Sequence, residues 1–293
     1  MDTVPHSLSL NESAWTNLTS RRSRFRLSGP DRIRFLNGQI TNNVALDLRR
    51  KSLPACLCSL KGKVEALVWV TENDAGDAVL IDGERAQREQ IFQRLDRYLI
   101  ADDCELKDVT DEWKLAHHFG QTENGTGRRA ANRMGIEGQD IWAHSSDDPD
   151  WSEEDELSAD DREKLEVLSA LPAWGFEMTG NEFPSELRLD EWAVDFHKGC
   201  YLGQEIVSRI ESVGQTKRNL FLLETREPLG KDEKVVVSGK QIGVTTRNSV
   251  FFGGPVYLTP ALLATDQAES VTLDSEDHGR RIFLPHRHGS HDP

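Results

Sequence analysis

The hydrophobic pattern of this chain changes period repeatedly, and that change most constrains the fold. Polar and apolar residues alternate over 23–27, which indicates a half-buried strand, and two apolar runs within 55–70 indicate a hairpin. Segments 84–100 and 204–212 instead space their apolar residues three and four apart, as amphipathic helices do. A further short helix is expected over 185–193. Strands and helices interleave without the regular rhythm of a parallel sheet. The pattern therefore predicts an α+β fold.

The chain changes character after about residue 218, where short strand candidates follow one another between Gly, Pro and Asp residues. They are Leu220–Leu223, Lys234–Val237, Ile242–Thr246, Val256–Leu258, Val271–Leu273 and Ile282–Leu284. Such spacing is typical of a small antiparallel barrel. We therefore divide the chain into an α+β region, residues 1–214, and a C-terminal β-barrel domain, residues 215–293.

The charge balance excludes some classes of partner. The net charge is −15, from 50 acidic and 35 basic residues among 293. Nucleic-acid-binding domains carry a basic face, so we expect no direct tight binding to nucleic acid. No apolar run approaches the ~18 residues of a membrane-spanning helix, and we expect no membrane contact. The first residues show no secretory signal, which predicts a cytoplasmic protein.

The cysteine and histidine spacing predicts no metal site. Four cysteines are too few for a disulfide framework, and no C-x-x-C spacing occurs. Cys56 and Cys58 share one face of an apolar strand, where free thiols pack as small hydrophobes. The C-terminal His286, His288 and His291 are interpreted as part of a frayed terminus rather than as metal ligands.

Residues 194–220, VDFHKGCYLGQEIVSRIESVGQTKRNL, combine a cysteine with a helix start. Cys200 stands just before the helical pattern, and His197 and Lys198 precede it. A helix N-terminus and nearby cations favour a thiolate. From the residues alone, a functional thiolate and a buried, inert thiol are equal alternatives.

The stretch from Lys198 to Glu205, KGCYLGQE, resembles the K-G-C-Y-x-G-Q-E signature of the YgfZ family, which is related to glycine-cleavage T-proteins. Upstream, residues 29–43 resemble the family's G-x-D and F-L-x-G-Q-x-T-N-D blocks. Lys61–Val64 and Leu95–Val109 resemble its second conserved turn and the helix-to-strand passage that follows. The resemblance covers nearly the whole chain in the expected order.

The resemblance implies two interleaved α+β lobes and a C-terminal antiparallel β-barrel around a central channel that binds tetrahydrofolate or a one-carbon derivative. It also implies support of iron–sulfur enzyme assembly or repair, with iron–sulfur proteins as partners and a link to tRNA modification. Cys200 would be the reactive thiol. Lys198, Arg209, Lys217 and Arg218 are candidates for the glutamate tail of folate. The candidate folate-binding residues are Lys198, Gly199, Tyr201, Gly203, Gln204, Glu205, Arg209, Asn42, Asn43 and Trp174.

The sequence departs from the family pattern in three motifs. Asn43 replaces an aspartate. Aminomethyltransferases of the superfamily carry G-G-x-x-D-D where this chain has Lys61–Ala66, so the Asp pair is absent. Relatives also carry R-x-E-x-G before a proline, and its Glu can pair with the pterin ring. An ungapped alignment on Pro172 places Glu166 at the Arg of that motif, whereas a two-residue shift places it at the Glu.

The sequence is compatible with three functions. The first is a folate-binding accessory protein. The second is an aminomethyltransferase that passes a one-carbon unit to tetrahydrofolate, which the missing Asp pair disfavours because that proton transfer needs an acid or a base. The third is an interaction protein that has lost folate binding.

Overall fold

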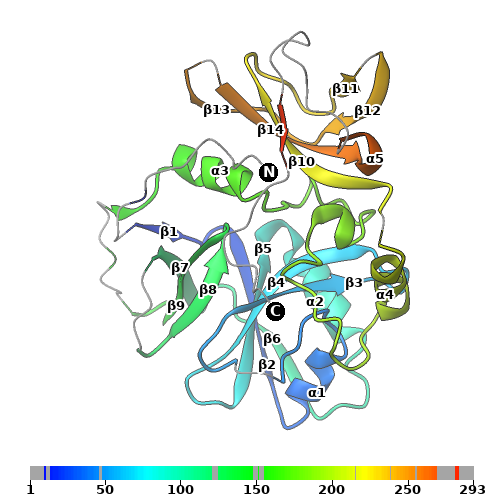
Figure 1. Cartoon of the computed structure of the whole chain (residues 1–293). Coiled ribbons are helices and arrows are strands. Elements are labelled where there is room, and N and C mark those ends of the chain that lie inside the picture. The colour runs from blue at the N-terminus through cyan, green and yellow to red at the C-terminus, as the bar shows by residue number, and fades with distance from the viewer. Residues whose placement is uncertain are drawn as a thin grey trace.

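The computed structural model describes residues 10, 14–45, 48–120, 125–147, 151, 155–214, 216–237, 239–254, 256–268 and 281–283. Within these residues the chain forms three antiparallel sheets with short helices between and around them (Figure 1). The predicted Val271–Leu273 strand and the C-terminal histidines lie outside the described residues.

The N-terminal sheet has five strands in the order β3-β4-β5-β2-β6. These strands are β2 (Arg22–Ser28), β3 (Leu53–Cys58), β4 (Val64–Glu72), β5 (Ala78–Glu84) and β6 (Glu105–Asp108). The predicted strand 23–27 and hairpin 55–70 are thereby confirmed. One face is covered by α1 (Arg32–Asn37) and α2 (Arg88–Asp96), whose Phe35, Leu36, Ile91 and Leu95 pack with Phe25 and Leu27 of β2.

The middle sheet has four strands in the order β1-β7-β9-β8. They are β1 (Trp15–Asn17), β7 (Trp113–Phe119), β8 (Arg128–Arg133) and β9 (Ile136–His144). Because β1 pairs with β7, Trp15 lies opposite His118. The first described strand thus belongs to the middle sheet, the next strands build the N-terminal sheet, and β7 to β9 complete the middle sheet, so the two lobes interleave as predicted.

The C-terminal sheet follows the path β11-β12-β14-β10-β15, and β13 also pairs with β14. The strands are β10 (Arg218–Thr225), β11 (Lys234–Val237), β12 (Lys240–Thr245), β13 (Val250–Gly253), β14 (Val256–Ala264) and β15 (Arg281–Phe283); a short helix, α5 (Thr265–Ala268), follows β14. No pairing closes this path among the described residues, so the sheet is antiparallel as expected, but a closed barrel is not confirmed.

The segment between the middle and C-terminal sheets contains α3 (Ala159–Leu168), a 3₁₀ turn η3 (Ser185–Leu187) and α4 (Gln204–Val213). A 3₁₀ turn η1 (Arg85–Gln87) precedes α2, so the helix predicted over 84–100 is shorter than expected. The helix predicted over 185–193 is wrong, because Arg188 takes a left-handed φ of 56° and ends the turn.

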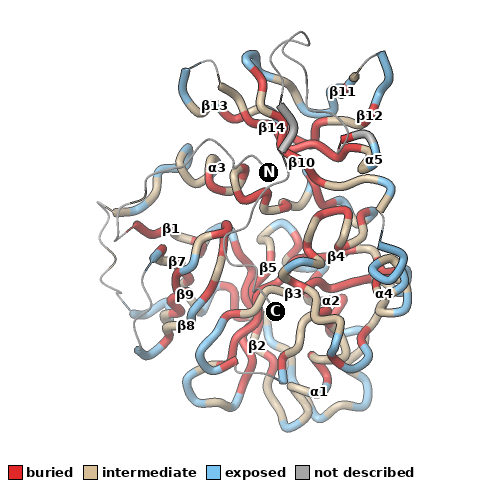
Figure 2. Tube along the Cα trace, viewed as in Figure 1, coloured by how far each residue is buried: buried red, intermediate tan, exposed pale blue. Residues whose placement is uncertain are grey.

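A second core, here called the central core, joins the second face of the N-terminal sheet to this connecting segment and to the C-terminal sheet. It contains Cys56, Cys58 and Trp69 of the N-terminal sheet, Leu189 and Ala193 of the connection, and Leu220 and Leu258 of the C-terminal sheet. Figure 2 shows the buried residues along the strands and the exposed ones along the turns and the outer side of α4. Val207 of α4 belongs to this core and Phe196 packs on it, so the signature stretch lies beside the core.

Candidate functional site

Two glycines interlock the signature loop with the β3–β4 hairpin. Gly203 caps α4 with a φ of +87°, and a Cβ there would lie 2.4 Å from the Ser59 carbonyl oxygen. Gly62 in the hairpin turn has a φ of +71°, and its Cβ would lie 3.0 Å from Ile206 Cβ. Glycine adopts positive φ without steric cost and lets two backbones approach closely. This contact fixes the N-terminus of α4 against the N-terminal sheet.

Lys198 points into the protein and not toward a ligand. Its ammonium donates three hydrogen bonds of 2.7 Å each, to the backbone oxygens of Asn37, Ile40 and Asn42. Burial lowers the pKa of Lys198 to about 8. All three N–H donors are used, so the predicted contact of Lys198 with a folate carboxylate does not fit this geometry. Lys198 instead holds the end of α1 and the turn after it against the signature loop.

The two asparagines of the upstream block also make local contacts. Asn42 Nδ2 donates to the Pro54 carbonyl at 2.8 Å, and Asn43 Oδ1 accepts from the Ala45 amide at 3.0 Å. Because Lys198 binds the Asn42 carbonyl, the structure brings this block and the signature loop together.

The other signature residues divide into buried and exposed groups. Tyr201 is buried, and the Lys198 ammonium nitrogen lies 5.3 Å from the centroid of the Tyr201 ring. The Tyr201 hydroxyl has no hydrogen-bond partner in the described part of the chain. Burial raises the pKa of this phenol. Gln204 Oε1 accepts from the Tyr201 amide at 3.4 Å, while Glu205 and Arg209 form an exposed ion pair of 2.7 Å on α4. Gly199 and Cys200 are exposed.

Cys200 differs from the other three thiols in its exposure. Cys56 and Cys58 are fully buried, and burial raises the pKa of Cys56 to about 12 and that of Cys58 well above its ordinary value. Burial and the neighbouring Asp102 also raise the pKa of Cys104. The structure thus confirms that Cys56 and Cys58 are core thiols, and it excludes a buried Cys200.

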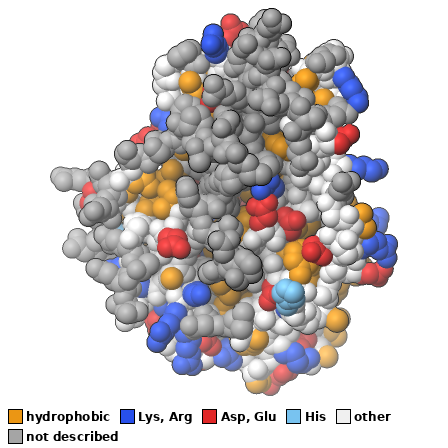
Figure 3. Space-filling model, viewed as in Figure 1, with side chains coloured by type: hydrophobic (Ala, Val, Ile, Leu, Met, Phe, Trp, Pro, Cys, Tyr) orange, Lys and Arg blue, Asp and Glu red, His pale blue; other side chains and the backbone are white. Residues whose placement is uncertain are grey.

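Trp174 belongs to a set of partly exposed aromatic side chains that pack on the central core, here called the aromatic rim. Its members are Trp174, Trp192, Phe196 and Phe252. Trp192 lies 6.0 Å from Trp69 between ring centroids. In the view of Figure 3, hydrophobic and acidic side chains lie together to the right of the middle of this face. Partly exposed rings are surfaces on which a planar ligand can stack.

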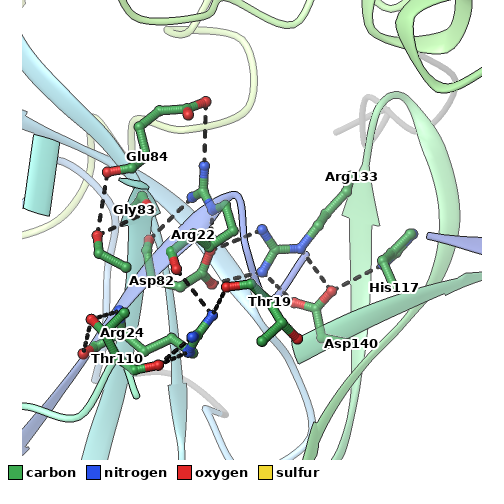
Figure 4. Close-up of polar contacts among 11 residues, drawn as sticks. Thr19, Arg22, Arg24, Asp82, Gly83, Glu84, Thr110, His117, Arg133 and Asp140 are labelled. Carbon is green, nitrogen blue, oxygen red and sulfur yellow. Dashed lines mark hydrogen bonds and ion pairs between the residues drawn. The ribbon is translucent and has the colours of Figure 1, made fainter. Parts of the chain in front are cut away.

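Sequence reasoning missed a buried charge network between the N-terminal and middle sheets (Figure 4). Arg133 of β8 binds Asp82 of β5 at 2.7 Å and Asp140 of β9 at 2.7 Å. Asp140 also contacts His117 Nδ1 at 2.9 Å, and Arg22 binds Asp82 at 2.6 Å. Burial alone would raise the pKa of Asp140, but the Arg133 guanidinium outweighs it and holds this pKa below its usual range. In the sequence these Arg and Asp residues stand far apart on separate strands, and no local pattern indicates that they form a network.

The guanidinium groups of Arg22 and Arg133 also lie over the Trp69 ring, 5.0 and 4.6 Å from its centroid. Such contacts attract a cation to the ring face. The network therefore connects the interface between the lobes to Trp69, whose ring contacts Trp192 of the aromatic rim.

The positions of the absent Asp pair do not face the central core. The β3–β4 register pairs Cys58 with Val64 and Leu57 with Ala66, which leaves Glu65 as an unpaired bulge residue. Ala66 packs in the core under α1 and α2, and Glu65 binds Arg94 of α2 at 2.8 Å. The carboxylate nearest to these positions is therefore held in an ion pair on the α2 side.

A cavity of about 510 Å³ opens on this α2 side. Its lining residues are Glu65, Ala86, Glu89, Gln90, Gln93, Arg94 and Arg97. None of them is a predicted folate-binding residue, so the expected channel between the lobes stays a prediction.

Within the described residues, no group of three His, Cys, Asp or Glu side chains is arranged to hold a metal ion. The prediction that the chain has no metal site also concerned His286, His288 and His291, and these three residues lie outside the described part of the chain. No helix of the described chain is long and apolar enough to cross a membrane.

Glu166 of α3 forms an ion pair with Arg21 at 2.9 Å. Burial raises the pKa of the Glu166 carboxyl, although Arg21 acts in the opposite direction. Leu168, two residues on, packs on the central core. With the ungapped alignment, an apolar side chain would thus occupy the position of the pterin-binding Glu, so the identity of the residue that reads the pterin stays open.

Two known proteins resemble the chain in sequence over most of its length. The chain is 24% identical to a mitochondrial iron-sulfur cluster assembly factor IBA57 homolog of Neurospora crassa, over 70% of this chain and 52% of that protein. It is 22% identical to the tRNA-modifying protein YgfZ of Hamiltonella defensa, over 89% of this chain and 87% of that protein. The match thus spans about half of the Neurospora protein. No protein-family model matches the chain.

Among solved structures, the glycine cleavage system aminomethyltransferase T of Bartonella henselae superposes with a TM-score of 0.73 over 93% of this chain and 84% of that chain, at 14% identity. The fold is therefore that of this aminomethyltransferase T. In sequence, the chain is similar to the YgfZ and IBA57 proteins.

Proposed function

We propose that this chain is a tetrahydrofolate-binding accessory protein that supports iron–sulfur enzyme assembly or repair and, through it, tRNA modification. The observation that carries the proposal is the signature loop, in which Gly203 fixes α4 and Lys198 fixes the upstream block while Cys200 stays exposed. The names of the relatives, an iron–sulfur cluster assembly factor and a tRNA-modifying protein, supply the pathway.

The residues beside this loop fit a reduced folate. The aromatic rim offers faces for a planar pterin or benzoate ring. The Tyr201 hydroxyl is buried without a partner among the described residues, and a ligand atom would satisfy it. Lys217 is exposed and Arg209 has only a surface ion pair, so both are available to a glutamate tail, whereas Arg218 is engaged by Glu186 at 2.9 Å.

We do not assign aminomethyl transfer to the chain. That reaction needs an acid or base beside the folate nitrogen. Glu65 is turned toward α2 and paired with Arg94, and Ala66 has no ionisable group. Cys200 is proposed as a reactive thiol, for which its exposure is the support.

Two assays test the proposal. Equilibrium dialysis with tetrahydrofolate should show one saturable site per chain, and its absence in folded protein would leave an interaction protein without folate. A glycine-cleavage assay with aminomethylated carrier protein should show no turnover. Turnover above the no-enzyme control would restore the aminomethyltransferase assignment.

A further inference from the structure

One half-buried carboxyl group, that of Asp190, lies beside the aromatic rim. Asp190 lies in a helical turn in which Leu189 accepts a hydrogen bond of 2.8 Å from the Ala193 amide. Leu189 and Ala193 are fully buried in the central core, and Trp192 packs on that core. Asp190 is therefore held at the edge of the central core, between buried neighbours.

Among the described residues, no side chain forms a hydrogen bond or an ion pair with Asp190. In the described chain its carboxylate meets only the amide groups of its own residue and of Glu191. Glu191, the next residue, is bound by Arg188 at 2.5 Å, and Asp195 accepts from the His197 amide at 2.8 Å. A half-buried carboxylate without a cation or hydroxyl donor is costly, and such groups are found where a ligand supplies the missing donors.

The turn is also fastened to the predicted site. Thr41 Oγ1 donates to the Ala193 carbonyl at 2.6 Å, and the Thr41 carbonyl accepts from the Asp195 amide at 3.0 Å. Asn42 follows Thr41 and is held by Lys198. Asp190, the upstream block and the signature loop thus form one connected unit.

We propose that the Asp190 carboxylate accepts hydrogen bonds from the edge of the ligand ring that carries adjacent N–H donors, the amino-pyrimidine edge of a reduced pterin, while Trp192 flanks the ring. This inference rests on the proposed folate-binding function. A carboxylate matches two parallel N–H donors, and hydrogen bonds to a charged acceptor are among the stronger ones in proteins.

The proposal has a pH signature. Burial and then the like charge of Glu191 raise the pKa of Asp190 to about 6, although Arg188 acts in the opposite direction. These are the charged groups of its own turn. Across from it on β3, the Cys56 thiol stays protonated, because burial raises its pKa to about 12. Since the ligand needs the ionised carboxylate, affinity should fall as the pH drops below about 6.

The test is equilibrium dialysis with 5-formyltetrahydrofolate at pH 7.5 and pH 5.5 on the wild-type chain, Asp190→Asn and Glu191→Gln. Asp190→Asn should weaken binding at pH 7.5 by roughly 10–100-fold, as expected for lost charge-assisted hydrogen bonds, and should flatten the pH dependence. Glu191→Gln, one residue away and paired at the surface, should bind like the wild type at pH 7.5, where the Asp190 carboxyl is ionised in both proteins.

Two competing ligands distinguish recognition of the pterin ring from recognition of the glutamate tail. A pterin-6-carboxylate competitor should lose affinity for Asp190→Asn, and p-aminobenzoylglutamate should not. Equal affinity of Asp190→Asn and wild type at pH 7.5 would overturn the inference while leaving folate binding intact. No binding by the folded wild type would overturn the proposed function and this inference with it.

Discussion

Cys200 should be the most reactive thiol of the chain, because it is exposed while Cys56 and Cys58 are fully buried and Cys104 is half-buried with a raised pKa. Each unit by which a thiol pKa exceeds the pH costs about tenfold in thiolate. With limiting iodoacetamide near pH 7, peptide mass spectrometry should find Cys200 labelled roughly tenfold faster or more. Faster labelling of any other cysteine in the native protein would contradict this.

The sequence places Lys198 next to Cys200 and predicts that its charge stabilises the thiolate. In the structure, the Lys198 ammonium is instead turned inward to three backbone oxygens. That contact joins residues about 160 positions apart, and neither spacing nor composition could reveal it. The prediction that Cys200 reacts fastest therefore rests on the exposure of its thiol and not on a neighbouring cation.

Asp190→Asn should stabilise the fold at pH 7 while it weakens binding. The pKa of Asp190 is raised from 3.8 to about 6, so the folded protein holds a proton that the unfolded chain has already released between these values. Stability therefore falls as pH rises from 3.8 to 6, and the penalty persists above 6. Removing the charge should add about 1–2 kcal/mol to the free energy of unfolding at pH 7. Urea melts should show this gain vanish near pH 4; a loss of stability at pH 7 would contradict it.

At the scale of elements, the contact between α4 and the β3–β4 hairpin should depend on Gly203. Gly203→Ala would force an L-residue to a φ of +87° and place its Cβ 2.4 Å from a carbonyl oxygen. We expect a loss of roughly 2–4 kcal/mol in the free energy of unfolding. Gly199→Ala is the matched control in the same loop, because nothing lies within 4 Å of its added Cβ. Similar denaturant midpoints for the two variants would show that the close approach is unimportant.

The same elements show what sequence patterns can predict. The helix expected over 204–212 is found as α4, because its apolar stripe lies between glycines with positive φ at Gly203 and Gly214. The helix expected over 185–193 fails at Arg188, a non-glycine residue in the left-handed region that tertiary contacts impose. Likewise, the bulge at Glu65 leaves no mark in the apolar pattern of β4.

At the scale of the whole molecule, the charge network of Figure 4 holds two lobes together. Removing one partner of a buried ion pair leaves a buried charge without compensation. Arg133→Met should therefore cost roughly 3–5 kcal/mol in the free energy of unfolding. Arg209→Met removes an exposed pair and should cost less than about 1 kcal/mol. Denaturant unfolding of both variants checks this, and equal losses would contradict a joining role.

The three-sheet arrangement was predictable from the family resemblance but not from periodicity. Local patterns located most strands, including β11 at its observed bounds. The pairing of Trp15 with His118, which interleaves the lobes, joins residues about 100 positions apart. Such non-local pairing depends on tertiary packing, and the pattern of a single strand does not encode it.

The central claim is that the upstream block, the turn at Asp190 and the signature loop form one folate site. Hydrogen–deuterium exchange of the wild-type chain with and without saturating 5-formyltetrahydrofolate tests it most directly. We predict slower exchange at residues 41–43 and 189–204. Unchanged exchange there, or protection confined to the α2 cavity at residues 86–97, would contradict it.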